Sequence, residues 1–96
     1  MIGKVHNISG MKIFASCDKE LLGKTIITKD FEIHFSKDFY GTSEIAIEEI
    51  IKHLNDCDSA NIFGKKICAL LLNKKIIKED IIIYIEDVPH VQIYKI

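Results

Sequence analysis

The first third of the chain contains short runs in which apolar and polar residues alternate, the pattern of strands with one buried face. The runs KVHNI (4–8) and MKIFASC (11–17) flank Ser9-Gly10, and a small-residue turn between two such runs is typical of a β-hairpin. Further on, TIIT (25–28) and FEIHF (31–35) flank a Lys-Asp pair, and the second run predicts a half-buried strand. Between these pairs, Asp18 is expected to cap one helical turn, KELL, which Gly23 closes.

Helical spacing begins after Gly41. Apolar residues at 47, 50, 51 and 54 form one buried stripe, and Thr42 or Ser43 is a suitable N-cap. A second helix is predicted over roughly 60–73, with Ser59 as its cap, and its apolar residues surround it almost completely, so that it should be largely buried. Gly64 would lie inside this helix, where a glycine suits the close approach of another backbone.

The last sixteen residues predict two more strands. The run IIIYIE (81–86) is apolar on both faces, as a central strand would be. The run VQIYKI (91–96) is expected to pair with it antiparallel through a loop over 87–90, where Pro89 fits because it has no N–H for a ladder. Residues 1–96 are therefore expected to form a single α+β domain, a two-layer sandwich of a mostly antiparallel sheet with two helices on one face.

The charged residues separate into blocks. All thirteen basic residues are lysine, and the formal net charge is −1, which argues against a dedicated nucleic-acid binder with a plain basic footprint. Counting lysines and acids, residues 38–60 carry −5 and residues 61–78 carry +5. The lysines of the second block could contact RNA phosphates, or they could simply complement the helix C-terminus and its solvated edge.

The three cysteines bear on compartment and on metal binding. An odd number without close pairing does not form a disulfide framework, so buried free thiols in a reducing cytosol are the simpler account, and a cytoplasmic location is expected. His53 and Cys57 are four residues apart and could share a helix face with Cys68 as a third ligand, but no C-x-x-C accompanies them. We therefore expect no metal site and no cofactor. The apolar runs are too short to cross a membrane, so no membrane partner is expected.

A few other residues could carry chemistry. Cys17 stands at the start of a helical turn, which favours a thiolate, but the adjacent Asp18 opposes it. His90 is expected to be exposed at a loop–strand junction, with Gln92 on the same side of the strand, and the two could bind a polar ligand or His90 could fix the turn. The aromatic loop at 39–41 could stack on a base, or it could anchor the helix entry.

Four separate motifs, taken in order, resemble the archaeal family catalogued as domain of unknown function 424: CDKELLGK (17–24), FYG (39–41), ANIFGKK (60–66) and VPHVQI (88–93). The resemblance covers nearly the whole chain and implies a small cytosolic α+β domain without an assigned activity. One departure is Val91, where a smaller alanine is usual in the family. The matching positions are Cys17, Asp18, Leu22, Gly23, Lys24, Phe39, Tyr40, Gly41, Asn61, Gly64, Pro89, His90 and Gln92.

Five of these matching positions carry polar side chains that a fold does not strictly require. The sequence therefore predicts a binding site at Lys24, Tyr40, Asn61, His90 and Gln92. With no assembled catalytic group, the favoured function is a non-catalytic binding module in RNA metabolism or translation, with RNA or a ribosomal component as its partner. The alternatives are a small enzyme or small-molecule binder around His90, Gln92 and Lys24, with Cys17 as a further candidate, and a homo-oligomer that pairs through an apolar C-terminal edge strand.

Overall fold

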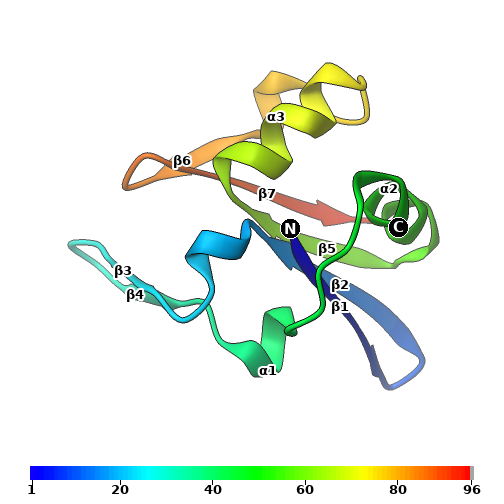
Figure 1. The fold of residues 1–96 in the computed structure, drawn as a ribbon, viewed down its shortest axis with the longest axis horizontal. Coiled ribbons are helices and arrows are strands. Elements are labelled where there is room, and N and C mark those ends of the chain that lie inside the picture. The colour runs from blue at the N-terminus through cyan, green and yellow to red at the C-terminus, as the bar shows by residue number, and fades with distance from the viewer. Residues whose placement is uncertain (96) are drawn as a thin grey trace.

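The computed structural model describes residues 1–95, which form a five-stranded sheet and a small two-stranded sheet (Figure 1). The larger sheet has the order β1-β2-β5-β7-β6, and its only parallel pair is β2 with β5. Its strands are β1 (Ile2–Ile8), β2 (Met11–Cys17), β5 (Ser59–Phe63), β6 (Ile83–Ile85) and β7 (Val88–Tyr94). The smaller sheet pairs β3 (Thr25–Ile27) with β4 (Glu32–His34).

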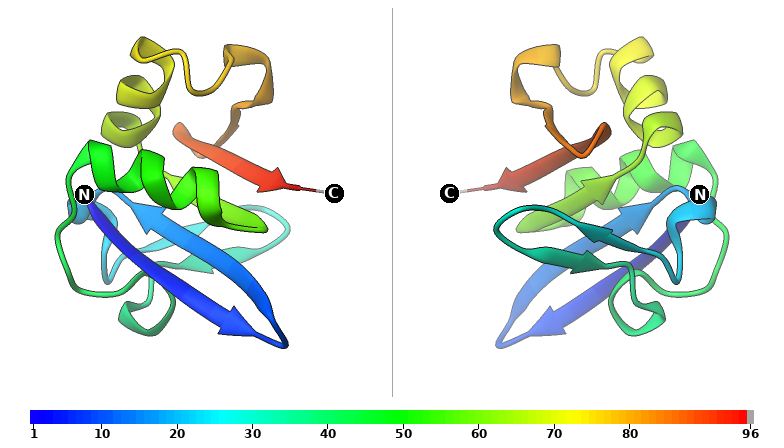
Figure 2. Two further views of the ribbon diagram at one scale, coloured as in Figure 1. Left: turned by 90° about the vertical axis from the view of Figure 1, so that its right-hand side faces the viewer. Right: turned by 90° about the vertical axis from the view of Figure 1, so that its left-hand side faces the viewer.

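Two helices cover one face of the larger sheet, which confirms the α+β class (Figure 2). Helices α2 (Ile47–Asp56) and α3 (Lys65–Asn73) share a core with the side chains that β2, β5 and β7 direct toward them. The opposite face is partly covered by the short helix α1 (Lys37–Tyr40), the 3-10 turn η1 (Lys19–Leu21) and the β3–β4 hairpin. A second 3-10 turn, η2 (Glu79–Ile81), precedes β6. No helix within residues 1–95 is long and apolar enough to cross a membrane.

The N-terminal hairpin forms as the alternating pattern predicts. Ile8 pairs with Met11, and Ser9 and Gly10 both adopt positive φ in the turn between them. The stripe of α2 is also confirmed, since Ile50 and Leu54 are buried against the sheet.

The predicted helix over 60–73 is wrong in its first part. Residues 59–63 form β5, the middle strand of the sheet, and the helix begins at Lys65. Ser59 therefore pairs with Tyr94 and Ile13 instead of capping a helix. A short run of mostly small and apolar residues suits a buried strand as well as a buried helix, and here the two neighbouring strands decide between them.

The C-terminal strands also differ from the expectation. IIIYI does not supply a central strand: β6 covers only 83–85, lies at the sheet edge, and leaves Ile83 and Tyr84 exposed. The turn is made by Glu86 and Asp87, both at positive φ, so Pro89 lies inside β7 and not in a loop. Strand β7 is internal, between β5 and β6, so it cannot act as the expected edge strand. Its expected end, Ile96, lies outside the described residues.

The segment before α2 is not the predicted helix start. The Ser43 carbonyl accepts from Gly3 of β1 and the Ile45 N–H donates to the Met1 carbonyl just before β1, and α2 begins only after Ala46, with no side-chain cap. Helix α1, which the sequence reading placed in a loop, is capped by Ser36, whose hydroxyl accepts from the Phe39 N–H.

Asp18 caps a different helix from the one expected. Its side chain makes no cap bond to the KELL turn, and both carboxylate oxygens instead accept from the first turn of α3, from Lys66 N at 2.8 Å and Ile67 N at 2.9 Å. Gly64 leaves room for this carboxylate, because a Cβ there would lie 2.3 Å from the Asp18 carboxyl carbon. At φ +133° Gly64 also turns the chain from β5 into α3.

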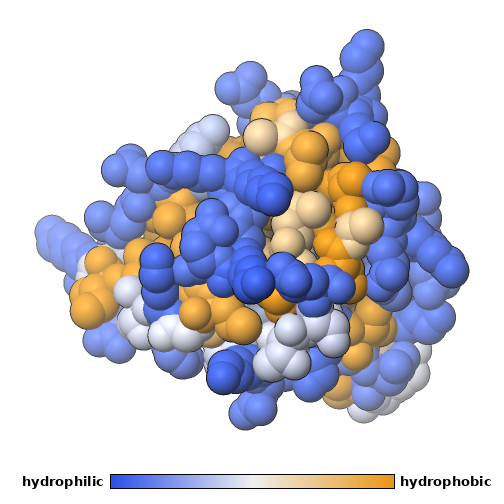
Figure 3. All heavy atoms as spheres, viewed as in Figure 1, coloured by the Kyte–Doolittle hydropathy of each residue, from blue (hydrophilic) through white to orange (hydrophobic). Residues whose placement is uncertain are grey.

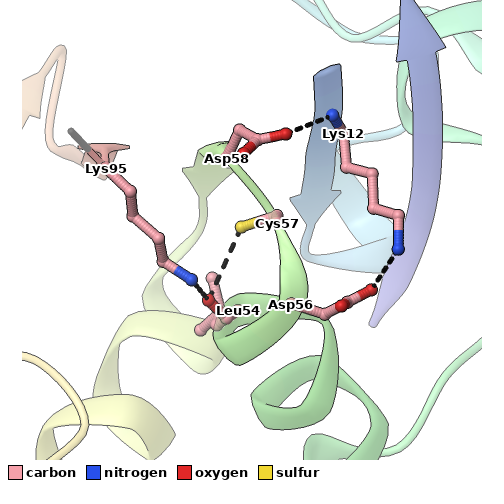
Figure 4. A network of polar contacts seen from close by, with 6 residues as sticks. All are labelled: Lys12, Leu54, Asp56, Cys57, Asp58 and Lys95. Atoms are coloured by element: carbon pink, nitrogen blue, oxygen red, sulfur yellow. Dashed lines mark hydrogen bonds and ion pairs between the residues drawn. The ribbon is translucent and has the colours of Figure 1, made fainter. Parts of the chain in front are cut away.

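The other end of β5 is fixed by polar contacts at the turn that follows α2 (Figure 4). The Asp58 carboxylate accepts from the Lys12 backbone N–H at 2.7 Å, and the Lys12 ammonium pairs with Asp56 at 2.8 Å. The backbone of Asp58 also bonds to Lys12 and to Lys95, which follows β7. This turn therefore joins β2, β5 and β7 where the parallel pair begins.

Replacing Gly64 with alanine should destabilise the protein by about 3 kcal/mol, because the new methyl group would displace the Asp18 carboxylate and the residue would be strained at positive φ. Gly10→Ala is the matched control, since Gly10 has φ +80° but no atom within 4 Å of its would-be Cβ, and it should cost only about 1 kcal/mol. Urea unfolding of both variants measures the difference. Equal losses would show that the space beneath Gly64 is not required.

Candidate functional site

The sheet face opposite α2 and α3 carries three of the five predicted site residues, Asn61, His90 and Gln92, and Tyr40 of α1 packs against this face. Strand register places Lys4, Ala15, Asn61 and Gln92 in one row across β1, β2, β5 and β7. The next row toward the end of β7 contains His6, Ile13, Ser59 and Tyr94. We call the side chains of these two rows, together with the exposed pair Ile8 and Met11, the open face.

A chain of hydrogen bonds joins α1 to the open face. The Tyr40 hydroxyl donates to Asn61 Oδ1 at 2.8 Å, and Asn61 Nδ2 donates to Gln92 Oε1 at 3.1 Å. Tyr40 itself is buried, and burial raises the pKa of its phenol above the ordinary value, so the hydroxyl keeps its proton. The two amides are fixed in orientation by this chain, and the side chain at its end, Gln92, is exposed.

His90 is not exposed, contrary to the expectation. It is only 8% exposed, it stacks on Phe63 with ring centroids 3.9 Å apart, and its Nδ1 lies 2.9 Å from the Ile62 carbonyl oxygen. Because a carbonyl can only accept, Nδ1 carries a proton. Burial lowers the pKa of His90, and the Ile62 carbonyl and the Gln92 side chain only partly oppose this shift. His90 is therefore a neutral, packed ring behind Gln92.

Aromatic rings connect the two sides of this region. The centroids of successive rings lie between 3.9 and 5.5 Å apart along one series, the spacing of favourable aromatic pairs. His6 Nε2 also donates a hydrogen bond to the Phe39 carbonyl oxygen at 2.7 Å, which holds α1 against β1. The series runs through His6, Phe39, Tyr40, Phe35, Phe63 and His90.

Lys24 and Cys17 do not join the site. Lys24 is exposed beside β3, and within the described chain no hydrogen bond or ion pair links its side chain to the other four residues. Cys17 is fully buried, and burial together with the charge of Asp18 raises its pKa to about 12, which opposes the thiolate that a nucleophile needs.

The suggested metal ligands are also separated. His53 packs on Phe14 and faces Glu49 at 3.8 Å, whereas the Cys57 thiol donates to the Leu54 carbonyl. All three cysteines are free and buried. Among residues 1–95, no group of three histidine, cysteine or acidic side chains is placed to hold a metal ion.

Two shallow hollows lie away from the open face. One, of about 270 Å³, is lined by residues of η1 and by Asp18, Gly64, Lys65 and Val88. The other, of about 240 Å³, lies between α3 and β6. Neither is lined by Asn61, His90 or Gln92.

The four motifs of the family resemblance, distant in sequence, meet in the structure. Asp18 of the first bonds to the helix that follows Gly64, Tyr40 of the second bonds to Asn61 of the third, and the Pro89 carbonyl of the fourth accepts from Gly64 N. A family model described as protein of unknown function DUF424 matches residues 6–96. The chain belongs to this family.

A solved structure supports the fold of this family member. An uncharacterized conserved protein from Methanopyrus kandleri has a TM-score of 0.80 at 24% sequence identity, over 97% of this chain and 89% of the other. No curated protein matches the chain. The departure at Val91 is accommodated in the core, since this side chain is fully buried toward the helices and away from the open face.

Sequence reasoning missed Tyr94 and His6, which complete the open face. Tyr94 is 74% exposed and lies two residues beyond Gln92, on the same side of β7. The period-two alternation of VQIYKI gave this signal, because residues 92 and 94 share a face in any strand. His6 could be placed beside them only once β5 was known to be a strand between β2 and β7.

The stability of the protein should fall as the pH drops below 6.5, because unfolding frees His90 to bind a proton that the folded state resists. The pKa of His90 is lower in the folded protein than in the unfolded chain, so the neutral ring contributes its full stabilisation at a pH above the unfolded-state pKa. This contribution is lost as the pH falls toward the folded-state pKa, at no more than about 1.4 kcal/mol per pH unit. Urea midpoints between pH 7.5 and 5.5 measure the slope. His90→Gln should flatten it, whereas His34→Gln, at an exposed site on β4, should not; an unchanged slope in His90→Gln would contradict the assignment.

Removing the Tyr40 hydroxyl should cost about 1 kcal/mol of unfolding free energy, because Tyr40→Phe leaves Asn61 Oδ1 without its donor. Tyr94→Phe removes a hydroxyl from a side chain that is 74% exposed and should change stability by less than about 0.5 kcal/mol. Thermal unfolding of the two variants side by side tests the hydrogen bond. A loss in Tyr94→Phe equal to that in Tyr40→Phe would contradict it.

Proposed function

We propose that this protein is a non-catalytic module that binds single-stranded RNA on the open face. The observation that carries the proposal is the placement of exposed Tyr94 next to the Asn61–Gln92 amide pair, at the part of this sheet face that α1 and the β3–β4 hairpin leave open. Single-stranded RNA is typically read by aromatic rings that stack on bases and by polar groups that bond to base edges.

The dimensions of the surface suit a short single strand. Four neighbouring strands contribute to the row from His6 to Tyr94, so the row spans three strand spacings, or about 14 Å. Ile13 and Ser59, which are apolar or small, lie between the His6 and Tyr94 rings in this row. Sheet platforms of this kind stack two or three bases on their aromatic residues.

The hydrogen bonds of the site support recognition of bases. Asn61 is held by Tyr40, and it in turn orients Gln92, so the exposed amide of Gln92 is preorganised to donate to a base edge. Buried, neutral His90 packs on Phe63 and is not placed to act as an acid or base on a ligand. A non-catalytic role therefore suits the arrangement better than chemistry at His90.

The lysine block does not form part of this surface. The basic residues of 61–78 belong to α3 and the segment after it, on the opposite layer of the sheet, and Lys4 is the lysine that the strand register places on the open face. Binding should therefore depend mainly on stacking and amide contacts, with few phosphate contacts. The affinity for RNA should fall only weakly with salt, with a slope of log K against log salt of about −1.

Fluorescence anisotropy with a labelled single-stranded oligoribonucleotide of about ten mixed nucleotides tests the proposal. Tyr94→Ala should weaken binding by roughly 5- to 100-fold, the effect of losing one base stack. Tyr84→Ala removes a comparably exposed tyrosine on the helix side of the sheet and should leave the affinity for RNA within twofold.

Three results would contradict the proposal. These are absence of binding even at low salt, equal losses in the two tyrosine variants, and a steep salt slope that is removed by replacing the lysines of α3. If a protein ligand were found to cover Tyr94 and Gln92 while RNA did not bind, the open face would be a protein-docking surface instead.

A further inference from the structure

The strongest unassigned feature lies on the other side of the sheet, where the edge strand β6 meets α3. We propose that the groove between β6 and α3 is a docking site for an acidic, extended peptide segment of a partner protein, which adds as a strand to the free edge of β6. The site shares no residue with the open face, so this proposal is independent of RNA binding.

The backbone of β6 has a free edge. Strand β6 ends the sheet order, and Tyr84 pairs with Pro89 across the ladder to β7. Pro89 has no N–H, and its carbonyl accepts from Gly64 N on the β5 side. The Tyr84–Pro89 pair is therefore the non-hydrogen-bonded type, so the N–H and C=O of Tyr84 point away from β7. Within residues 1–95, no strand pairs with them.

The side chains around this edge lack the usual protection against strand addition. The five residues 81–85 are uncharged, and Ile81, Ile83 and Tyr84 are 43%, 56% and 63% exposed. Natural edges are commonly protected by charged residues, bulges or proline on the outer side. In Figure 1 the β6–β7 turn projects from the molecule beside the β3–β4 hairpin, and the turn itself carries the only acids of this hairpin, at 86 and 87.

A groove lies where an added strand would place its side chains. The hollow of about 240 Å³ is lined from the sheet by Ile82, Tyr84 and Pro89, and from α3 by Lys65, Cys68, Ala69 and Leu72. A residue paired with Tyr84 on an added strand would point to the same face of the sheet, and so toward α3. The space and its apolar lining suit one leucine-sized side chain. Figure 3 shows apolar side chains reaching the surface over α3.

The charge of α3 indicates an acidic partner. Residues 61–78 contain five lysines and no acid, and none of these lysines forms an ion pair with a described residue. Lys65 stands at the groove itself. Acidic residues at 79–80 and 86–87 lie before and after β6 in the chain and should repel carboxylates at both ends of the strand. The carboxylates of a partner strand should therefore point toward α3, on residues two positions from the apolar side chain that enters the groove.

Two labelled heptapeptides of identical composition test on which face of the partner strand the acidic side chains lie, and a lysine version tests whether the partner must be acidic. In Ser-Glu-Thr-Leu-Thr-Glu-Ser, the glutamates share a face with the leucine, whereas in Ser-Thr-Glu-Leu-Glu-Thr-Ser they lie on the opposite face. The first should bind at least threefold more tightly by fluorescence anisotropy, and a version with lysine for both glutamates should bind more weakly still. On binding, hydrogen exchange of the Tyr84 amide should slow, because the added strand accepts from it.

Three variants separate the edge from the groove. Tyr84→Pro removes the outward N–H without affecting a bond to β7 and should lower the affinity for the first peptide at least tenfold. Tyr84→Val keeps the N–H and should lower this affinity less than threefold. Lys65→Glu should lower the affinity for the first peptide about tenfold, whereas Lys37→Glu, on α1 at the opposite face of the sheet, should not change it.

Other outcomes would overturn the proposal. Equal binding of all three peptides, no binding at millimolar concentration, or full binding by Tyr84→Pro would do so. Light scattering that shows a dimer dissolved by Tyr84→Pro would instead assign the edge to a second copy of this chain.

Discussion

The hydrogen bonds between the Asp18 carboxylate and the first turn of α3 fix the positions of β2, β5 and α3 relative to one another, and most of the structure is built around these three elements. Both oxygens accept from backbone N–H groups that a helix leaves without partners, and the anion faces the positive end of the helix dipole. Asp18 directly follows β2, and its own N–H donates to the Phe63 carbonyl at the end of β5. One residue therefore joins the ends of the two parallel strands to the start of the helix that crosses them.

Both proposed surfaces depend on this junction. The register of β5 against β2 and β7 brings Asn61 between Tyr40 and Gln92, and the direction of α3 sets the groove beside β6. The same sheet thus presents a polar and aromatic face on one side and an edge with an apolar groove on the other. Family motifs occur at the junction and around the amide pair, whereas β6 shows none of the four quoted motifs.

Local patterns predicted some elements well because those elements depend on neighbours in sequence. The hairpin of β1 and β2 and the buried stripe of α2 needed only the periodicity of their own residues. The strand at 59–63 could not be recognised in this way, because a five-residue run of mostly small and apolar side chains suits a buried strand or a buried helix. Only pairing with residues more than 25 positions away decides the outcome. The error at His90 followed from the same cause: with Pro89 in a loop its neighbour is exposed, but with Pro89 inside β7 it packs on Phe63.

Four of the five predicted site residues nevertheless come together. They were chosen as motif positions whose polar side chains a fold does not require, a criterion that does not depend on a correct strand assignment. Lys24 was chosen by the same criterion but lies beside β3. Nothing in the sequence indicated that this position is separated from the other four residues. Tyr94 was overlooked because it matched no family motif, although its alternation with Gln92 placed it on the same face.

Hydrogen exchange at the start of α3 tests the central role of Asp18 most directly. In the wild type, the amides of Lys66 and Ile67 should exchange slowly, although first-turn amides ordinarily exchange fast for want of a partner. In Asp18→Ala, these two amides should become unprotected and the amides of β5 should exchange faster with them, while the β3–β4 hairpin is unchanged. Fast exchange of Lys66 and Ile67 in the wild type, or protection that persists in Asp18→Ala, would contradict the account.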